Sequence, residues 1–347
     1  MSIWNKLKTV GTTTLIAASL TSITYASELV GYEIKKFTPE HRDEPMQVHT
    51  WYPATGGMQQ TIGGNAVFIG EPILANAQAT PGKYPVILLS HGSGGNAANL
   101  SWIASFMASK GAIVMAPNHP GTTSGDSIQK ETTKIWERPM DFRSMLDDIE
   151  RLLPAGTKRD EARTGIMGFS LGGYSALSLA GARASKFAYI SYCEKNRSNF
   201  DCGWLADGGV DLEQINQEKY DMSHKDNRIS FSIAVDPALS AAYKSDSLSA
   251  IEVPVSIINL GDKEHIPAAI NAREIPGQIP DATYHEIKGS SHFSFLGLCT
   301  KKAKYILLLI GEDPICTDPD GSERTVIHAE IKSLISTFLD QQLQNSH

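Results

Sequence analysis

The sequence has no basic stripe, and its 31 Lys and Arg are outnumbered by 38 Asp and Glu, which gives a formal net charge of −7. A protein that follows a phosphate backbone needs clustered positive charge, so this absence disfavours nucleic-acid binding. Internal repeats and low-complexity tracts are missing too. Hydrophobic residues make up 41% of the 347 positions, enough for a packed core, which argues against a disordered, collagen-like or coiled-coil chain. We expect one domain with insertions.

An apolar run long enough for a membrane anchor is also lacking. Lys6 and Lys8 precede a mildly apolar stretch, Val10 to Ile23, which is short and rich in Thr and Ser for crossing a bilayer. Thr24-Tyr25-Ala26 then offers small residues at the −3 and −1 positions of a cleavage site. We therefore expect residues 1–26 to be a secretory signal peptide, with no permanent membrane anchor, and the protein to be periplasmic or secreted.

Cysteine is scarce, and all four cysteines lie in the part predicted to be exported: Cys193, Cys202, Cys299 and Cys316. An even count in an oxidising compartment predicts two disulfides, for which three connectivities exist. We favour the two pairings between near neighbours, because the spans they would close are polar and rich in loop residues. No C-x-x-C spacing or nearby His pair is present, so a metal site is not expected.

From Tyr84 onward, short apolar runs alternate with longer amphipathic runs, which predicts an α/β fold with a mostly parallel sheet flanked by helices. The segment from Leu29 to Ala54 alternates in polarity and predicts antiparallel strands at one edge of the sheet. The expected strands cover residues 86–89, 112–116, 164–168, 187–192, 229–235, 253–260 and 283–287, and the expected helices cover residues 99–110, 141–153, 171–184, 267–275 and 326–343.

Two segments interrupt this alternation, at about residues 194–227 and 299–324, and each is associated with one cysteine pair. The first is polar, contains several glycines and shows no long apolar period, so we expect an excursion over one face of the sheet. The second contains the apolar run Tyr305–Ile310, which we expect to be a buried helical segment. Both segments are predicted to be disulfide-bearing insertions.

Gly168-Phe169-Ser170-Leu171-Gly172 is a G-x-S-x-G sequence between a predicted strand and a predicted helix. This is the context of a nucleophile elbow, in which small residues two positions before and after the serine let its hydroxyl project from a sharp turn. The backbone N–H of Leu171 would then lie at a helix N-terminus and stabilise an oxyanion. The alternative is that Ser170 only caps the helix beside packing glycines.

A serine nucleophile needs a base, and His292 in Gly289-Ser290-Ser291-His292-Phe293 has the expected position on a loop after a late strand. Its rival His285 lies inside the predicted strand, which fixes it to one face. The remaining late histidines, His224, His265 and His328, are interpreted as loop or helix-surface residues.

Three carboxylates could orient that imidazole, since each follows a predicted strand between the serine and the histidine. Asp236 follows the strand that ends at Val235, whereas Asp262 and Glu264 follow the strand that ends at Leu260. Asp236 also precedes Pro237, so it could instead cap a helix. Spacing alone leaves the acid open among these three residues.

His91-Gly92-Ser93-Gly94-Gly95 is a glycine-rich loop between an early predicted strand and a helix. Such a loop supplies the second oxyanion N–H in enzymes with a nucleophile elbow, and here the donor is expected to be Ser93. A phosphate-binding loop is the competing interpretation, but the lysine and the spacing of a P-loop are absent.

Together these motifs resemble the α/β-hydrolase superfamily, and within it the branch of dienelactone-hydrolase-like proteins and platelet-activating-factor acetylhydrolases. The resemblance covers most of residues 27–347 and implies a single α/β-hydrolase domain with oxyanion donors at Ser93 and Leu171. In acetylhydrolase-like members the acid follows the strand after the nucleophile helix, which implies Asp236 here. True dienelactone hydrolases have a cysteine where Ser170 stands, so their lactone chemistry is not inherited. The motifs that carry the resemblance are Trp51-Tyr52-Pro53, Leu89-Ser90-His91-Gly92, the G-x-S-x-G sequence, Val235-Asp236-Pro237-Ala238 and His292-Phe293-Ser294-Phe295.

The expected function is that of an exported serine hydrolase that cleaves carboxylic esters through an acyl-enzyme, without metal or organic cofactor. The substrate would be a small-molecule or lipid ester. Two alternatives are also enzymes: a phospholipase-like or acetylhydrolase-like protein, and a lipid or polyester hydrolase. A third alternative, from another class, is a catalytically silent binding protein with the same fold. The oligomeric state is left open. Four aromatic residues are candidates for an acyl pocket: Trp102, Trp136, Phe169 and Trp204.

Overall fold

The computed structural model describes residues 29–319 and 321–344. The predicted signal peptide, residues 1–26, lies outside the described residues, as does its predicted cleavage site. Within the described part of the chain, no helix is long and apolar enough to cross a membrane.

The core of the molecule is a ten-stranded sheet in the order β14-β13-β12-β11-β7-β8-β2-β1-β5-β4. The six strands from β14 to β8 run parallel, and β2 joins β8 in the antiparallel direction. This confirms a mostly parallel sheet with antiparallel strands at the edge formed by the early chain. The strands of the sheet are β1 (Gly31–Phe37), β2 (Met46–Tyr52), β4 (Met58–Ile62), β5 (Glu71–Ala75), β7 (Gly82–Ser90), β8 (Ile113–Pro117), β11 (Thr157–Phe169), β12 (Phe231–Val235), β13 (Val255–Leu260) and β14 (Ala282–Ile287); short pairs form between β3 (Ala54–Thr55) and β6 (Gln78–Ala79), and between β9 (Thr122–Thr123) and β10 (Asp126–Ser127).

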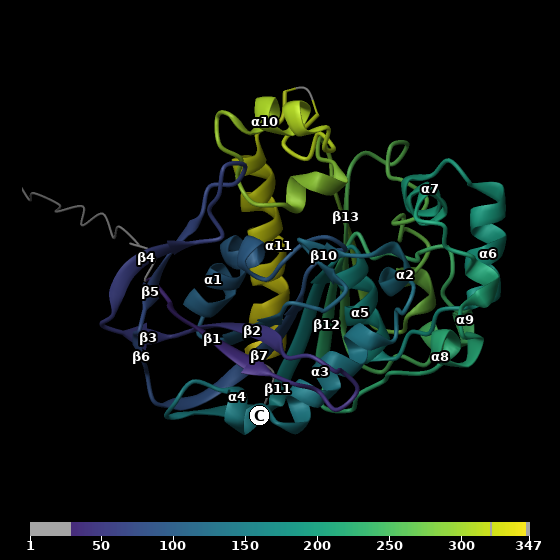
Figure 1. The fold of residues 1–347 in the computed structure, drawn as a ribbon. Helices are drawn as coiled ribbons and strands as arrows, with labels where there is room; N and C mark the ends of the chain where they lie inside the picture. Colours follow the sequence, from purple (N-terminus) through teal and green to yellow (C-terminus); the bar gives the residue numbers. More distant parts are fainter. Residues whose placement is uncertain (1–28, 320, 345–347) are drawn as a thin grey trace, which may run out of the picture.

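Helices cover both faces of this sheet (Figure 1). In β7, Ile87 and Leu89 pack on the face covered by helices α1 and α11, whereas Val86 and Leu88 pack on the face covered by α3, α4 and α5. Because successive side chains of a strand point to opposite faces, a strand buried on both sides is apolar throughout, as these runs are. The helices are α1 (Ser101–Ser109), α2 (Gln129–Thr132), α3 (Glu137–Asp147), α4 (Ile149–Leu152), α5 (Leu171–Ala180), α6 (Lys186–Lys195), α7 (Phe200–Asp207), α8 (Gln217–Asp221), α9 (Ser245–Leu248), α10 (Ala303–Ile310) and α11 (Arg324–Gln344), with 3₁₀ turns η1 (Ala98–Leu100), η2 (Leu212–Gln214), η3 (Pro276–Gln278) and η4 (His292–Phe295).

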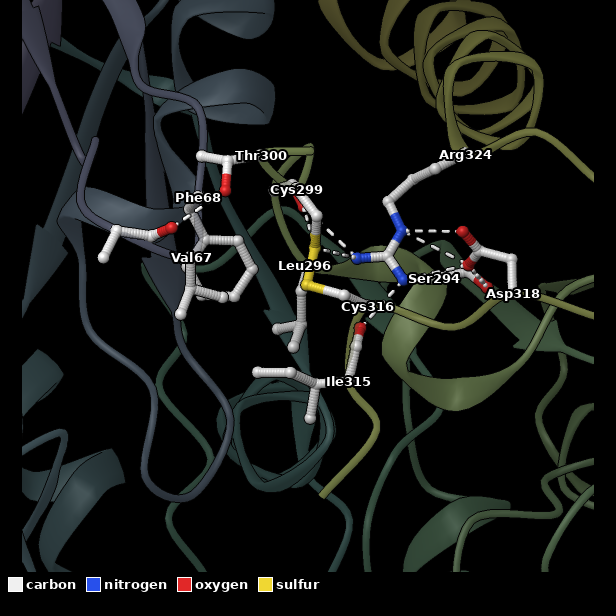
Figure 2. Close-up of a disulfide and its surroundings, with 12 residues drawn as sticks. Val67, Phe68, Ser294, Leu296, Cys299, Thr300, Ile315, Cys316, Asp318 and Arg324 are labelled. Carbon is white, nitrogen blue, oxygen red and sulfur yellow. Dashed lines mark hydrogen bonds and ion pairs between the residues drawn. A yellow bond between two sulfur atoms is a disulfide. The ribbon is translucent and has the colours of Figure 1, made fainter. Parts of the chain in front are cut away.

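Both favoured disulfides are present. Cys193 and Cys202 are joined with Cα atoms 5.4 Å apart, and Cys299 and Cys316 with Cα atoms 5.9 Å apart. The first bridge links α6 to α7, and the helices of this region lie together beyond one edge of the sheet (Figure 1). The second bridge closes the segment that carries α10, and the guanidinium of Arg324 lies beside it (Figure 2).

Two predicted elements are wrong. Residues 187–192, expected to be a strand, belong to α6, whose first turn is capped by Ser185: its hydroxyl accepts from the N–H of Ala188. A short apolar run does not distinguish a strand from a helix by period alone. Residues 267–275, expected to be a helix, are turns instead. The buried side chain of Asn259 bonds the carbonyl of Ile270 and the N–H of Ala272, and so replaces the bonds that a helix would use.

The run Tyr305–Ile310 does form part of a helix, α10, but its burial was predicted wrongly. Leu307 is buried, whereas Tyr305, Leu308, Leu309 and Ile310 are largely exposed. The sequence shows that the run is apolar, but it does not show how few neighbouring elements pack against the helix.

Candidate active site

Ser170 occupies the turn between β11 and α5 with φ of 57° and ψ of −119°, a conformation that L-residues rarely adopt. Its N–H donates to Val235 (2.9 Å) and its carbonyl accepts from Ala238 (2.9 Å), so the neighbouring strand holds the turn. A Cβ on Gly168 would lie 1.9 Å from the carbonyl oxygen of Gly172. The turn is therefore closed so tightly that a side chain at Gly168 does not fit, as the G-x-S-x-G spacing predicts.

His292 lies between Ser170 and Asp236 in one hydrogen-bonded row. The serine Oγ is 3.2 Å from the imidazole Nε2, and the imidazole Nδ1 is 2.8 Å from Oδ2 of Asp236. The ring of Phe169 stacks on the imidazole with centroids 4.6 Å apart, which restricts its tilt. With Nδ1 donating to the carboxylate, Nε2 is free to accept the serine proton.

The carboxylate of Asp236 is fully buried, and its second oxygen is also occupied. That oxygen, Oδ1, accepts from the backbone N–H of Leu260 and from the amide of Asn259, each at 2.8 Å. Two donors on one oxygen leave Oδ2 turned toward the histidine. Asp262 and Glu264, the other two candidates, form no hydrogen bond or ion pair with His292 in the described part of the chain.

The register of the parallel strands explains why residues so far apart in sequence meet. Phe169 is paired with Val235, so the residues that follow, Ser170 and Asp236, leave the sheet side by side. The next pairings, Val235 with Ile258 and Leu260 with Ile287, bring the later loops to the same edge. The carboxyl edge of the sheet therefore collects the serine, the acid and the loop that carries the histidine.

The glycine-rich loop after β7 passes directly beside Ser170. A Cβ on Gly92 would lie 3.2 Å from the Cβ of Ser170, so the backbone is in contact with the serine. The next residue is Ser93, and on the other side Leu171 is the first residue of α5, where its N–H has no acceptor within the helix. Leu171 and Gly92, the residue directly before Ser93, thus border Ser170.

Arg138 holds the carbonyl side of this loop. Its guanidinium, which is buried, donates to the carbonyls of His91 and Gly92 and to the hydroxyl of Thr122. The C=O and the N–H of one planar peptide unit point in opposite directions. Fixing the carbonyl of Gly92 toward Arg138 therefore turns the N–H of Ser93 away from Arg138.

A second Ser-His-Asp row lies beneath the loop, and sequence reasoning missed it. His119 contacts the hydroxyl of Ser90 through Nε2 (3.0 Å) and the carboxylate of Asp141 through Nδ1 (2.8 Å). All three side chains are fully buried, so this row has no access to a substrate. The one feature of the sequence that could have indicated this row is the position of His119, which lies two residues after the end of β8.

Burial and hydrogen bonds together set the charges of the second row. Burial lowers the pKa of His119 to about 4, so the ring is neutral near pH 7. Burial alone would raise the pKa of Asp141, but hydrogen bonds from His119, His41 and Arg42 outweigh it and keep that pKa well below its usual value. The row is thus a satisfied ionic network that supports the loop from below.

The other late histidines occupy structural positions. His285 lies on β14, as predicted, and His265 lies on a loop. His224 lies on a loop, as predicted, and is buried, whereas His328 lies in α11 but is buried rather than on the helix surface, which corrects the sequence interpretation. His328 stacks on Trp102 with centroids 3.8 Å apart and bonds the carbonyls of Ser294 and Leu296.

The four aromatic residues considered for an acyl pocket separate into different environments. Trp102 is buried and stacks on His328 of α11. Trp136 is buried in the same apolar cluster as Leu171, with Trp204 partly buried against it, and Phe169 lies under His292. A half-exposed aromatic residue near His292 is instead Phe200, with its ring centroid 6.1 Å from that of the imidazole.

A metal site would require free ligands. In the described ranges, the one cluster of potential ligands is Cys193, Asp201 and Cys202, and its two sulfurs are bonded to each other. Disulfide sulfur is not the thiolate that binds zinc, so this group does not fit a metal.

Comparison with known proteins agrees with this architecture. Residues 58–192, less than half of the chain, match the family model of chlorophyllase. No curated protein sequence matches. Among solved structures, a ferulic acid esterase from Streptomyces cinnamoneus superimposes with a TM-score of 0.59 at 16% identity, over 90% of this chain and 89% of its own. Two further matches are esterase Est22 (TM-score 0.46, 12% identity, covering 90% of this chain and 82% of that one) and esterase 2 of Thermogutta terrifontis (0.44, 13%, 81% and 95%).

The sheet order, the strand-turn-helix at Ser170 and the likeness to the first of these structures define an α/β-hydrolase fold. This confirms the fold that the sequence motifs predict. The narrower branch, dienelactone-hydrolase-like or acetylhydrolase-like, stays a prediction.

Proposed function

We propose that this protein is a serine hydrolase that cleaves carboxylic esters. The observation that carries the proposal is the row Asp236-His292-Ser170, joined at 2.8 and 3.2 Å, with the serine on a strained turn beside two candidate oxyanion donors. Strained backbone is common at functional sites, where the surrounding structure maintains it. A silent binding protein would have no need of this geometry.

In the proposed reaction, Ser170 Oγ attacks the ester carbonyl while His292 Nε2 takes the hydroxyl proton. The oxygen of the tetrahedral intermediate accepts from the backbone N–H groups of Ser93 and Leu171. As the intermediate collapses, the imidazolium returns its proton to the departing alkoxide, and the alcohol leaves an acyl group on Ser170. Water then attacks this acyl-enzyme with His292 as base, and the carboxylic acid and the free serine are released.

Asp236 stabilises the imidazolium that forms in each half-reaction. Its buried carboxylate remains hydrogen bonded to Nδ1 throughout and accepts two further donors. These donors keep the carboxylate in place, so the imidazole does not need to reorient as its charge changes.

An ester with an apolar group is the preferred substrate class. Two further aromatic rings, those of Phe200 and Phe293, lie near the imidazole, with centroids 6.1 and 5.5 Å from it. Such an aromatic rim favours an apolar acyl or alcohol group over a charged one. The two disulfides support a periplasmic or secreted location.

A series of nitrophenyl esters of increasing acyl length, assayed beside a short-chain phospholipid, tests the proposal and its nearest alternatives. We expect turnover of the soluble esters with kcat/KM highest for short or medium chains. Activity confined to lipid aggregates would favour the phospholipase or lipid-hydrolase alternative. Absence of turnover on every ester would favour the silent binding protein. The Ser170→Ala variant, purified in the same way, gives the background for each substrate.

Arg138 provides a prediction about the oxyanion loop. Its guanidinium donates to the carbonyls of His91 and Gly92, and the Gly92 carbonyl also accepts from the N–H of Gly95 and contacts Nδ1 of His91. Arg138→Met removes part of this support and should loosen the peptide that carries the N–H of Ser93. Loss of one such donor lowers kcat by about 10²-fold. We expect that loss in kcat with little change in KM, and partial recovery when guanidinium ion is added at concentrations below those that unfold the protein.

Arg228→Met is the matched control for this prediction. Arg228 also forms ion pairs, with Asp226 and Asp147. It precedes β12 and so lies at the amino ends of the parallel strands, whereas Ser170 follows the carboxyl end of β11. If both variants lose activity in proportion to their loss of stability, Arg138 has only a structural role.

A further inference from the structure

Helix α10 presents an apolar surface that nothing in the described chain covers. Ala303 and Leu307, four residues apart, face inward, where they pack with Phe68 and Cys316. The outward side chains are large and apolar, and they are exposed by 77% at Tyr305, 81% at Leu308, 86% at Leu309 and 60% at Ile310. A contiguous apolar surface of this kind marks an interaction site.

The helix is held firmly at one end of the molecule. Figure 1 shows α10 beyond the sheet, at one end of the molecule. The Cys299–Cys316 disulfide closes the segment, and Cys299 also pairs with Phe68. The backbone of a fixed helix loses little conformational entropy on docking, which favours binding through this face.

A buried arginine ties the segment to the rest of the molecule. Figure 2 shows Arg324 between the disulfide and Asp318, where it bonds the carboxylate and the carbonyls of Gly297 and Ile315. Asp318 also accepts from the hydroxyl of Ser294, which lies in η4 together with His292. The exposed helix is therefore rigidly connected to the turn that carries the proposed base.

Positive charge lies next to the apolar face. Lys301, Lys302 and Lys304 are exposed at the start of α10, and within the described residues none of them forms an ion pair. The nearest acidic residues in sequence, Glu312 and Asp313, lie past the end of the helix. Lysine beside exposed Leu, Ile and Tyr is the pattern of a helix that lies in a lipid interface, where the ammonium groups reach the phosphates.

We propose that α10 docks on the surface of anionic lipid. Tyr305, Leu308, Leu309 and Ile310 enter the boundary between head groups and acyl chains, and the three lysines contact lipid phosphates. The docking goes beyond the proposed hydrolysis and does not depend on it. The bond from Ser294 to Asp318 joins η4, which contains His292, to the segment that carries α10, so docking of α10 would bring His292 toward the lipid surface.

Co-sedimentation with vesicles tests this proposal. Vesicles of phosphatidylcholine alone are compared with vesicles that also contain phosphatidylglycerol, using the purified mature protein. We expect binding to the anionic vesicles and a loss of about tenfold or more in the partition coefficient for Leu308→Asp/Leu309→Asp. The triple variant Lys301→Gln/Lys302→Gln/Lys304→Gln should lose a similar amount on anionic vesicles only.

The control is Ile34→Asp/Met58→Asp. It places the same charge at two apolar side chains on strands β1 and β4, which are 48% and 58% exposed. It should bind as the parent does, and labelling of Ser170 by a fluorophosphonate reports that each variant is folded. Binding lost equally in the control, or absent in the parent, overturns the proposal. The proposal is also overturned if the parent does not bind vesicles but forms a dimer in size-exclusion chromatography, and Leu308→Asp/Leu309→Asp dissociates that dimer. The face would then bind a second copy of the chain.

Discussion

Asp236→Asn is expected to lower kcat by about 10⁴-fold while the protein stays folded. The reason lies in the two donors that already occupy Oδ1. In the variant, the amide oxygen of residue 236 must remain with the N–H of Leu260 and the amide of Asn259, so its NH₂ group faces His292. That NH₂ group donates to Nδ1, which forces the proton onto Nε2. An imidazole with its proton on Nε2 cannot accept the proton of Ser170.

Asp262→Asn is the control for this prediction, since Asp262 follows the neighbouring strand β13 and was an equal candidate by spacing. We expect its kcat and KM to match those of the parent. Circular dichroism and a melting curve on both variants show whether either has lost structure. If Asp262→Asn loses turnover and Asp236→Asn retains it, the acid belongs to the later strand.

Ser170→Ala is expected to abolish turnover, with a fall in kcat of about 10⁶-fold, because the serine and its base act as a unit. The substitution removes one oxygen atom from a site whose backbone bonds do not involve the hydroxyl. Stability should therefore change little, and any loss of rate reports on chemistry alone.

Ser175→Ala is the matched control on the same helix. Its hydroxyl is buried and bonds the carbonyl of Leu171, so the variant also removes a buried oxygen from α5. We expect this variant to keep most of its activity in the nitrophenyl ester assay. Equal activity of Ser170→Ala and parent would show that hydrolysis takes place at another site.

Much of the candidate site could be predicted because its signals are local. The turn at Ser170 is specified by five consecutive residues between an apolar run and a helix, and the loop at Ser93 by its glycines after a strand. His292 follows from the same logic of loops after late strands. The choice of Asp236 over Asp262 came from a resemblance, because spacing does not show which strand end faces the histidine.

The parts that sequence reasoning missed depend on contacts between distant residues. Asp141 begins the predicted helix at residues 141–153 and Arg138 precedes it, and only the packing of α3 under the glycine-rich loop gives them their partners. The exposure of α10 was missed for the opposite reason, since burial depends on neighbouring elements that the run Tyr305–Ile310 does not encode. Patterns predict elements well, but they do not predict what covers them.

Labelling with a fluorophosphonate probe, followed by mass spectrometry of the peptides, tests the central claim most directly. If Ser170 is activated by His292, the parent takes up one probe molecule on the peptide containing Ser170, and Ser170→Ala takes up none. Equal labelling of parent and Ser170→Ala, or labelling of the parent on a different serine, would contradict the account.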